Sequence, residues 1–98
     1  MTTKLVDRED YSDGFTGCGC SKWHFRNCGR NFVIEWCDKM FDTPSPEAKA
    51  YWGDDDGYII DWNELAASNN PNPKKACIEC LTEMYKKNLI PSLVFGEL

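Results

Sequence analysis

The sequence predicts a small, mainly α-helical domain, with a mixed α+β fold as the alternative. The chain of 98 residues is long enough for one hydrophobic core but not for two. Several segments place apolar residues at helical spacing next to residues that cap helices. Six cysteines in so short a chain indicate an irregular, cysteine-rich N-terminal part that a metal ion stabilises. We therefore expect residues 1–98 to form one helix-rich domain with little or no sheet, and residues 1–13 to be a flexible arm.

The first expected helix follows Asn31. Between residues 32 and 41 apolar side chains recur at positions i and i+4, and charged side chains fall between them. Asn31 can cap the N-terminus of this helix, and Thr43 ends it because the residue before a proline avoids the helical region. The segment 32–36 is also aromatic and β-branched, which leaves a short strand as the alternative. The longer helical pattern favours the helix.

Three further helices are expected downstream. Ser45 can cap a short helix that has Pro46 at its first position and ends at Gly53. The segment 61–67 begins with an aspartate and a glutamate three positions apart, which is the pattern of a capping box. A break rich in asparagine and proline then precedes a last helix, which we expect from about residue 74 to residue 87.

Two close cysteine pairs predict a structural zinc site. Cys18 and Cys20 lie in a glycine-rich stretch, and Cys77 and Cys80 lie three positions apart near the start of the last expected helix. The N-terminus of a helix favours the thiolate, which is the form of cysteine that binds a metal. Four thiolates from a turn and a helix would give a closed tetrahedral site for Zn2+. The sequence therefore predicts one structural zinc ion bound by Cys18, Cys20, Cys77 and Cys80.

The remaining cysteines and the single histidine leave alternatives for this site. His24 and Cys28 are alternate ligands, which could form a local site together with the first cysteine pair. Disulfides, buried thiols without a metal and an iron–sulfur cluster are the other states that the cysteines allow. Cys37 falls on the apolar face of the first expected helix, so we expect it to be a buried structural cysteine.

The sequence also predicts the environment of the protein. Its N-terminal residues have no apolar stretch of the length that a secretory signal requires, and no run reaches the roughly 20 apolar residues of a membrane span. We therefore expect a cytoplasmic protein with reduced thiols and no contact with a membrane, with a mature fragment of a secreted protein as the alternative.

Acidic residues concentrate in the middle of a chain whose formal net charge is -5. Residues 51–64 contain five carboxylates, four aromatic rings and no basic residue. Aromatic anchors surrounded by charge are typical of protein interfaces, where rings supply contact energy and charge supplies steering. The alternative is that the rings face the core and the carboxylates keep the protein soluble. We expect this stretch to contact a protein partner with a basic surface, through Trp52, Asp54, Asp55, Asp56, Tyr58, Asp61, Trp62 and Glu64.

A second stretch of the chain supports a different kind of partner. Cations and aromatic rings alternate there, and rings beside cations are how proteins hold single-stranded nucleic acid. The net negative charge argues against nonspecific binding of duplex by the whole surface, although not against a local basic patch. The residues that would bind nucleic acid in this alternative are Lys22, Trp23, Phe25, Arg26 and Arg30.

The sequence contains no recognisable catalytic set, so we expect no enzymatic activity. It has one histidine, no phosphate-binding loop and no βαβ pattern before its Cys-x-x-Cys pair. The acidic turn does not match a calcium-binding loop, because Trp52 and Asn63 would occupy its first and last ligand positions. We therefore expect a non-enzymatic regulator, adaptor or inhibitor of a larger protein, such as a phage or mobile element would encode. A zinc-finger-like protein that binds single-stranded nucleic acid is the first alternative, and an iron–sulfur or thiol redox protein is the second.

Overall fold

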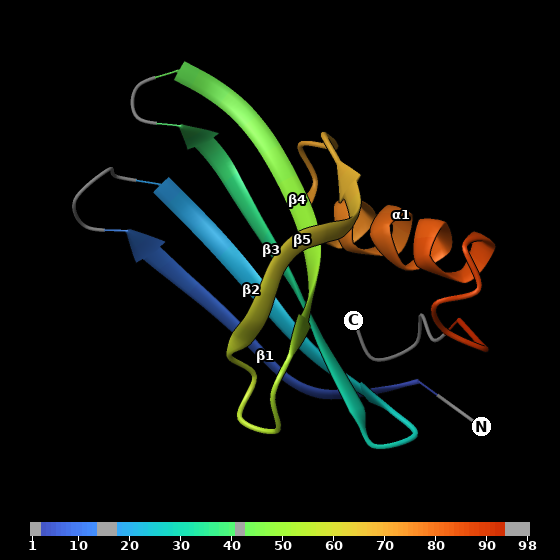
Figure 1. The fold of residues 1–98 in the computed structure, drawn as a ribbon. Coiled ribbons are helices and arrows are strands. Elements are labelled where there is room, and N and C mark those ends of the chain that lie inside the picture. Colours follow the sequence, from blue (N-terminus) through green and yellow to red (C-terminus); the bar gives the residue numbers. More distant parts are fainter. Residues whose placement is uncertain (1–2, 14–17, 41–42, 94–98) are drawn as a thin grey trace.

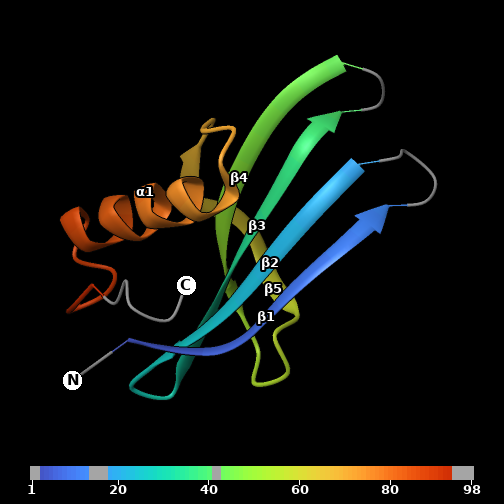
Figure 2. The same ribbon diagram turned by 180° about the vertical axis from the view of Figure 1, so that it is seen from behind.

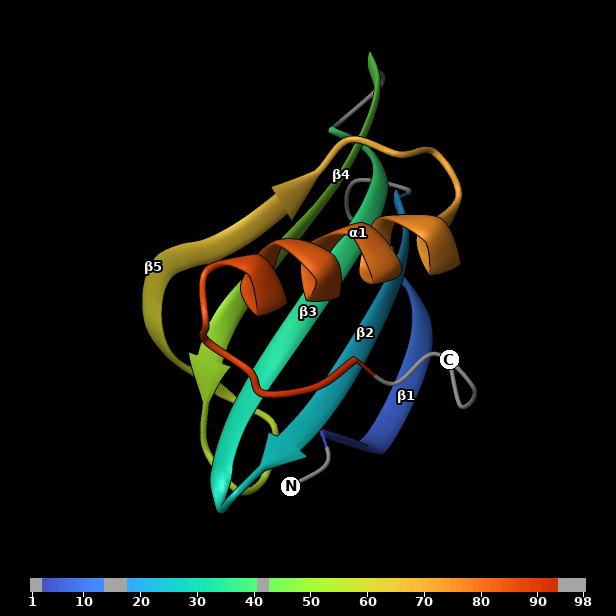
Figure 3. The same cartoon turned by 90° about the vertical axis from the view of Figure 1, so that its right-hand side faces the viewer.

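The computed structural model describes residues 3–13, 18–40 and 43–93, which form a five-stranded sheet and one helix (Figure 1). All strands are antiparallel, and each one pairs with its neighbour in the sequence, in the order β1-β2-β3-β4-β5. The helix lies across one face of this sheet, over β3, β4 and β5, as Figures 2 and 3 show from two sides. The elements are β1 (Lys4–Asp13), β2 (Cys18–Asn27), β3 (Arg30–Met40), β4 (Thr43–Gly53), β5 (Ile59–Ser68) and α1 (Pro73–Lys86).

The prediction of a mainly α-helical fold is wrong, because three of the four expected helices are strands. The helix expected after Asn31 is β3, the short helix expected before Gly53 is β4, and the helix expected over residues 61–67 belongs to β5. Residues Lys4–Asp13, which were expected to belong to a flexible arm, form the edge strand β1.

Apolar side chains on both faces of β3 explain why its sequence resembles a helix. Phe32, Ile34 and Trp36 point to the side that α1 covers, and all three are buried. Val33 points to the opposite side and is also fully buried. Apolar residues at adjacent as well as alternate positions fit a period of 3.6 about as well as a period of 2. A strand in the middle of a sheet can therefore show the pattern of an amphipathic helix.

Alanines explain the same error in β4 and β5. Ala48 and Ala50 on β4 and Ala66 on β5 belong to the buried cluster beneath α1, and Ala50 is paired directly with Ala66. Alanine is the best helix former, but its small side chain also lets a helix approach a sheet closely. Here the tertiary contact with α1 overrides helix propensity.

The helix expected from about residue 74 to residue 87 is confirmed as α1. Asn72 caps it, because its side-chain oxygen accepts a hydrogen bond of 3.0 Å from the backbone N–H of Lys75, and Pro73 follows at the start. Beyond the last turn Asn88 adopts a positive φ of 60°, which is common where helices end. No helix in the part of the chain that the structure describes is long and apolar enough to cross a membrane.

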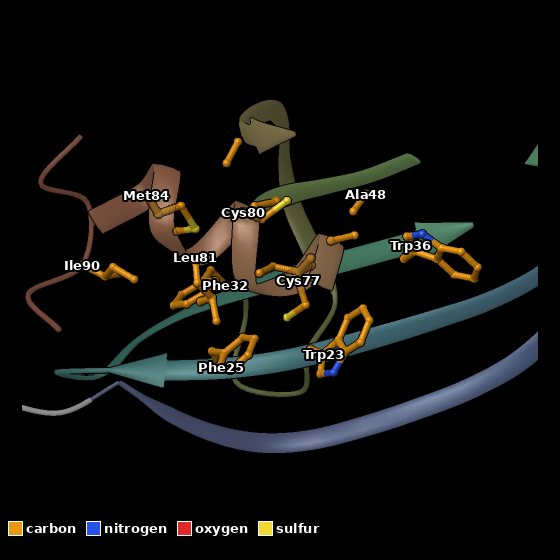
Figure 4. Close-up of a cluster of buried hydrophobic side chains, with 14 residues drawn as sticks. Trp23, Phe25, Phe32, Trp36, Ala48, Cys77, Cys80, Leu81, Met84 and Ile90 are labelled. Carbon is orange, nitrogen blue, oxygen red and sulfur yellow. The ribbon is translucent and has the colours of Figure 1, made fainter. Parts of the chain in front are cut away.

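The core lies between α1 and the face of the sheet that it covers (Figure 4). The rings of Phe25 and Phe32 stack there with their centroids 5.1 Å apart. Near the start of the helix Trp36 is held by a hydrogen bond of 3.0 Å from its Nε1 to the backbone oxygen of Asn70. The helix contributes the buried residues Ala76, Cys77, Cys80, Leu81 and Met84.

We call the opposite side of the sheet the open face, because no described helix covers it. Charged side chains on β2, β3 and β4 lie next to one another across this face, since Lys22 is paired with Glu35 and Glu35 with Lys49. Partial burial raises the pKa of Glu35, and Lys22 opposes this shift. The open face is thus polar in its middle, in contrast to the covered face.

β5 forms one edge of the sheet, and two of its backbone groups are bound by side chains from the end of α1. Its register with β4 shifts between Ala50 and Trp52 and again between Trp52 and Gly53, so that it bulges away from its neighbour. Glu83 of α1 accepts a hydrogen bond of 3.0 Å from the N–H of Ala67, and Lys87 donates one of 2.9 Å to the oxygen of Leu65. The first of these bonds, together with Lys87, lowers the pKa of Glu83. The helix therefore contacts β5 in two ways: it packs on the covered face of the strand, and its side chains bind the backbone of the strand.

Candidate functional site

Three large apolar side chains form an exposed line on β5 and the residue that precedes it. Tyr58, Ile60 and Trp62 are 67%, 67% and 69% exposed, whereas Ile59 and Asp61 between them are partly buried. The pairing register with β4 shifts at Ile60, because Trp52 pairs with Asp61 and Gly53 with Ile59, so the three residues are grouped by their exposure and not by strand alternation. We call these three residues the apolar stripe.

The apolar stripe borders the open face of the sheet. The ring of Trp62 meets the ring of Tyr51 edge to face, with the centroids 5.2 Å apart. Lys22 places its Nζ 5.5 Å from the ring centroid of Tyr58, close enough for a cation–π contact. Side chains of the sheet therefore fix the direction of both rings, while most of their area stays in water.

A tight turn over residues 54–58 leads into the stripe. The side chain of Asp54 accepts hydrogen bonds from the backbone N–H groups of Asp56 and Tyr58, at 3.0 and 2.9 Å. Its backbone also pairs with Tyr58, through an N–H···O bond of 2.9 Å. Gly57 has a φ of +84° and lies so close to His24 that an added Cβ would be 3.0 Å from the ring Nδ1. The turn is thus pressed against β2, and this contact positions Tyr58.

A buried hydrogen-bond network joins this turn to the sheet. His24 is 6% exposed, and its Nε2 lies 2.8 Å from Oδ1 of Asn31. That oxygen also accepts a bond of 3.0 Å from Arg26, while the amide nitrogen of Asn31 donates to Oδ1 of Asp55 at 2.9 Å. Because Oδ1 of Asn31 can only accept, the Nε2 of His24 is the donor. His24 therefore belongs to this network through its Nε2, and Gly57 lies against its Nδ1.

The structure brings together only part of the predicted partner-binding set. Trp62 and Glu64 are exposed on β5, Tyr58 is exposed just before it, and Asp56 is exposed in the turn beside them. Asp61 also lies on β5, but it is partly buried and paired with Trp52. The other predicted residues are placed differently: Asp54 and Asp55 hold the turn, and Trp52 points to the opposite side of the sheet.

Trp52 belongs with the core rather than with the stripe. Its ring meets Phe32 edge to face at 6.3 Å, and the guanidinium of Arg30 lies 3.5 Å above it. Sequence reasoning also missed Ile60, the central member of the stripe, because it selected aromatic and acidic residues only. The spacing of Tyr58, Ile60 and Trp62, at every second position of the sequence, would have found it.

The structure does not bring the four predicted zinc ligands together. Cys20 is paired with Cys37 across β2 and β3 on the open face, and Cys18 lies two positions away on the same side. Cys77 and Cys80 point from α1 into the core on the other side of the sheet. Residues 3–13, 18–40 and 43–93 contain no group of three or more histidine, cysteine, aspartate or glutamate side chains that could hold a metal ion. The donor set therefore does not fit a tetrahedral zinc site.

Burial also sets the properties of the cysteine pair on the helix. Cys77 and Cys80 are both fully buried. Desolvation raises the pKa of Cys80 to about 12 and raises that of Cys77 as well. The helix N-terminus does not offset this effect of burial. The zinc ion remains a prediction from the sequence that this arrangement does not support.

We predict that thiol alkylation will separate the cysteines by position. Cys28 is exposed in the turn between β2 and β3, so it should react with iodoacetamide at neutral pH, while Cys77 and Cys80 in the folded protein should stay unmodified. Their labelling should speed up as the pH rises toward their raised pKa, because the thiolate is the reactive form. Timed labelling followed by peptide mass spectrometry measures these rates.

The same experiment has a clear opposing result. Rapid labelling of Cys77 and Cys80 only after a chelator is added would show that a metal protects them. Loss of bound zinc from the Cys77→Ser variant, measured by elemental analysis, would then restore the four-cysteine site.

The residues of the nucleic-acid alternative are split between the surface and the core. Trp23 and Phe25 are 0% exposed and face α1. Arg26 and Arg30 are exposed, but Arg26 belongs to the network of Asn31 and Arg30 stacks on a ring of its own chain. Bases stack on exposed ring faces, and the buried rings of Trp23 and Phe25 offer none.

The site that the described residues do form is an apolar stripe on a strand edge, with carboxylates on both sides of it. It is held by a rigid turn and by rings of the open face. Comparisons with protein-family models, with curated proteins and with solved structures give no match for this chain, so its function has to be inferred from the arrangement of these side chains.

Proposed function

We propose that this protein is a non-enzymatic protein-binding module that regulates, links or inhibits a larger partner with a basic surface. The observation that carries the proposal is the apolar stripe, in which Tyr58, Ile60 and Trp62 are each exposed by 67% or more. Single exposed apolar residues are ordinary, but a continuous exposed patch marks an interaction site.

The stripe is large enough to anchor a partner. Burying the exposed part of one aromatic side chain contributes on the order of 2–4 kcal/mol, given about 25 cal/mol per Å². Hot spots of protein interfaces are of this size and consist mainly of rings that neighbouring contacts shield from water. The stripe offers two such rings with an isoleucine between them.

Charge around the stripe favours a basic partner. Asp56 and Glu64 are exposed on either side of it, and Glu9 lies across the open face. Lys49 is shared between Glu47 and Glu64, at 3.0 and 3.2 Å, so its charge is already offset. An acidic rim attracts a basic surface at long range and raises the rate of association.

The proposed contact uses side chains rather than added strands. Glu83 and Lys87 already bind the N–H of Ala67 and the backbone oxygen of Leu65, which an added strand would need near this end of β5. The rings point away from the sheet plane and remain accessible, so a partner would dock on them from the side of the open face.

The test compares the wild-type protein with the Ile60→Ser/Trp62→Ala double variant. Both are immobilised and exposed to an extract of the cells in which the protein occurs, and retained proteins are identified by mass spectrometry. We expect the wild type to retain a protein with a basic surface, and the double variant to lose it. With the purified partner, the affinity should fall at least tenfold, which corresponds to roughly 1.4 kcal/mol.

A matched control is the Tyr85→Ala variant, because Tyr85 is 45% exposed but lies on α1. It should bind like the wild type. Equal binding by the double variant and the wild type would show that the stripe is not the contact surface.

A second variant separates charge from apolar contact. Asp56→Asn combined with Glu64→Gln should slow association and weaken its dependence on salt, while dissociation changes little. Asp54 and Asp55 are left intact, because their carboxylates hold the turn. An unchanged association rate at low salt would show that the partner does not recognise the acidic rim.

A further inference from the structure

We infer that Cys20 and Cys37 form a reversible disulfide that cross-links β2 to β3. The two residues occupy directly opposed positions of the antiparallel pair, and their sulfur atoms lie 2.8 Å apart. Neither the proposed partner nor the apolar stripe enters into this inference.

The backbone geometry already suits this bond. Directly opposed residues of antiparallel strands have Cα atoms about 4.5–5.5 Å apart, and disulfides span Cα distances of about 4.4–6.8 Å. A disulfide has a sulfur–sulfur distance of about 2.05 Å. The sulfur atoms therefore need to approach by less than 1 Å, which side-chain rotation can supply without separating the strands.

Neighbouring contacts hold the pair in register. On one side Ser21 is paired with Trp36, and on the other the N–H of Gly19 donates to Asp38 at 3.0 Å. Both thiols are thus kept opposite each other in the reduced protein. The cross-link would join the β1–β2 hairpin to the β3–β4 hairpin, because Cys20 lies on β2 and Cys37 on β3.

The pair lies near the surface. Cys20 is itself buried but lines a surface groove together with Tyr11 and Gly19, and Cys37 is only partly buried. Burial and the neighbouring thiol raise the pKa of Cys37 to about 12. Exchange should therefore be slow at neutral pH and faster in mild base, because the thiolate is the attacking form.

The oxidant is a low-molecular-weight disulfide, such as oxidised glutathione. One protein thiolate attacks a sulfur of this disulfide, which forms a mixed disulfide and releases one small thiolate. The second protein thiolate then attacks the protein sulfur of the mixed disulfide and releases the other small thiolate. The two cysteines lose two protons and two electrons, and one small disulfide becomes two small thiols.

The test equilibrates the reduced protein with oxidised glutathione at pH 8, removes excess reagent and maps the disulfides by mass spectrometry. We expect one cross-linked pair of peptides containing Cys20 and Cys37, whose mass is 2 Da below the sum of the two reduced peptides because two hydrogen atoms leave. The melting temperature should rise by roughly 10 °C, and dithiothreitol should reverse the rise.

Two variants make the result specific. Cys37→Ala should show neither the cross-link nor the shift in melting temperature, while Cys28→Ala should show both, because Cys28 lies in the turn away from the pair. Circular dichroism confirms that each variant is folded. Peptide mapping of the wild type decides the matter even if a variant fails to fold: recovery of Cys20 and Cys37 as thiols, or a cross-link between other cysteines, overturns the inference.

Discussion

Replacing Phe32 by alanine should destabilise the protein by roughly 3–5 kcal/mol, which is a large part of the stability of a domain of this size. Phe32 is 0% exposed on the middle strand, and it contacts Phe25 on one side and Trp52 on the other. Its removal leaves a cavity beneath α1 that the sheet cannot close, because the strands on both sides fix its width. Chemical denaturation followed by circular dichroism measures the change in the free energy of unfolding.

A matched control for this prediction is Ile60→Ala on β5. Ile60 is also a large apolar residue of the sheet, but it is 67% exposed, so its truncation should change stability by less than about 1 kcal/mol. Similar losses for the two variants would contradict the position of α1 over Phe32.

The second large effect is expected for Gly57→Ala, which should cost about 2–4 kcal/mol. A φ of +84° is unfavourable for alanine, and the new Cβ would lie 3.0 Å from Nδ1 of His24. His24 cannot easily move, because Asn31 holds its other nitrogen at 2.8 Å. The turn over residues 54–58 would have to lift from the sheet, and Tyr58 would move with it.

Gly29→Ala separates the two causes of this loss. Gly29 has a similar φ of +78°, but an added Cβ would meet no atom within 4 Å. This variant should therefore show only the cost of the backbone conformation, about 1–2 kcal/mol. Thermal or chemical unfolding of both variants gives the difference, and equal losses would mean that the contact between Gly57 and His24 contributes nothing.

Local signals decided which elements could be predicted from the sequence. The helix α1 carries its own cap at Asn72 and its own stop near Asn88, and both act through neighbouring residues. The strands depend on partners that are distant in the sequence. Ala50 is in a strand because it faces Ala66 and α1, and no property of its neighbours shows this. The prediction therefore succeeded where the information is local and failed where it is tertiary.

The candidate site was predicted in part for a similar reason. Composition identified Tyr58 and Trp62, because rings among carboxylates are visible in the sequence. It also selected Trp52. The position of Trp52 on β4 directs its ring to the covered side of the sheet, where it meets Phe32. The cysteine pairs were combined by analogy with metal sites, but the sheet lies between them, and Cys20 faces Cys37 instead.

The hydrogen bonds that α1 makes to β5 also limit how this protein can assemble. A sheet grows by adding strands at its edges, and the hydrogen bonds from Glu83 and Lys87 occupy groups that a new strand would need at this edge. The other edge of the described sheet is β1, in which six of ten residues are charged. Charged edge strands disfavour pairing with a second copy. The two edges of the described sheet therefore carry different features that oppose growth by strand addition.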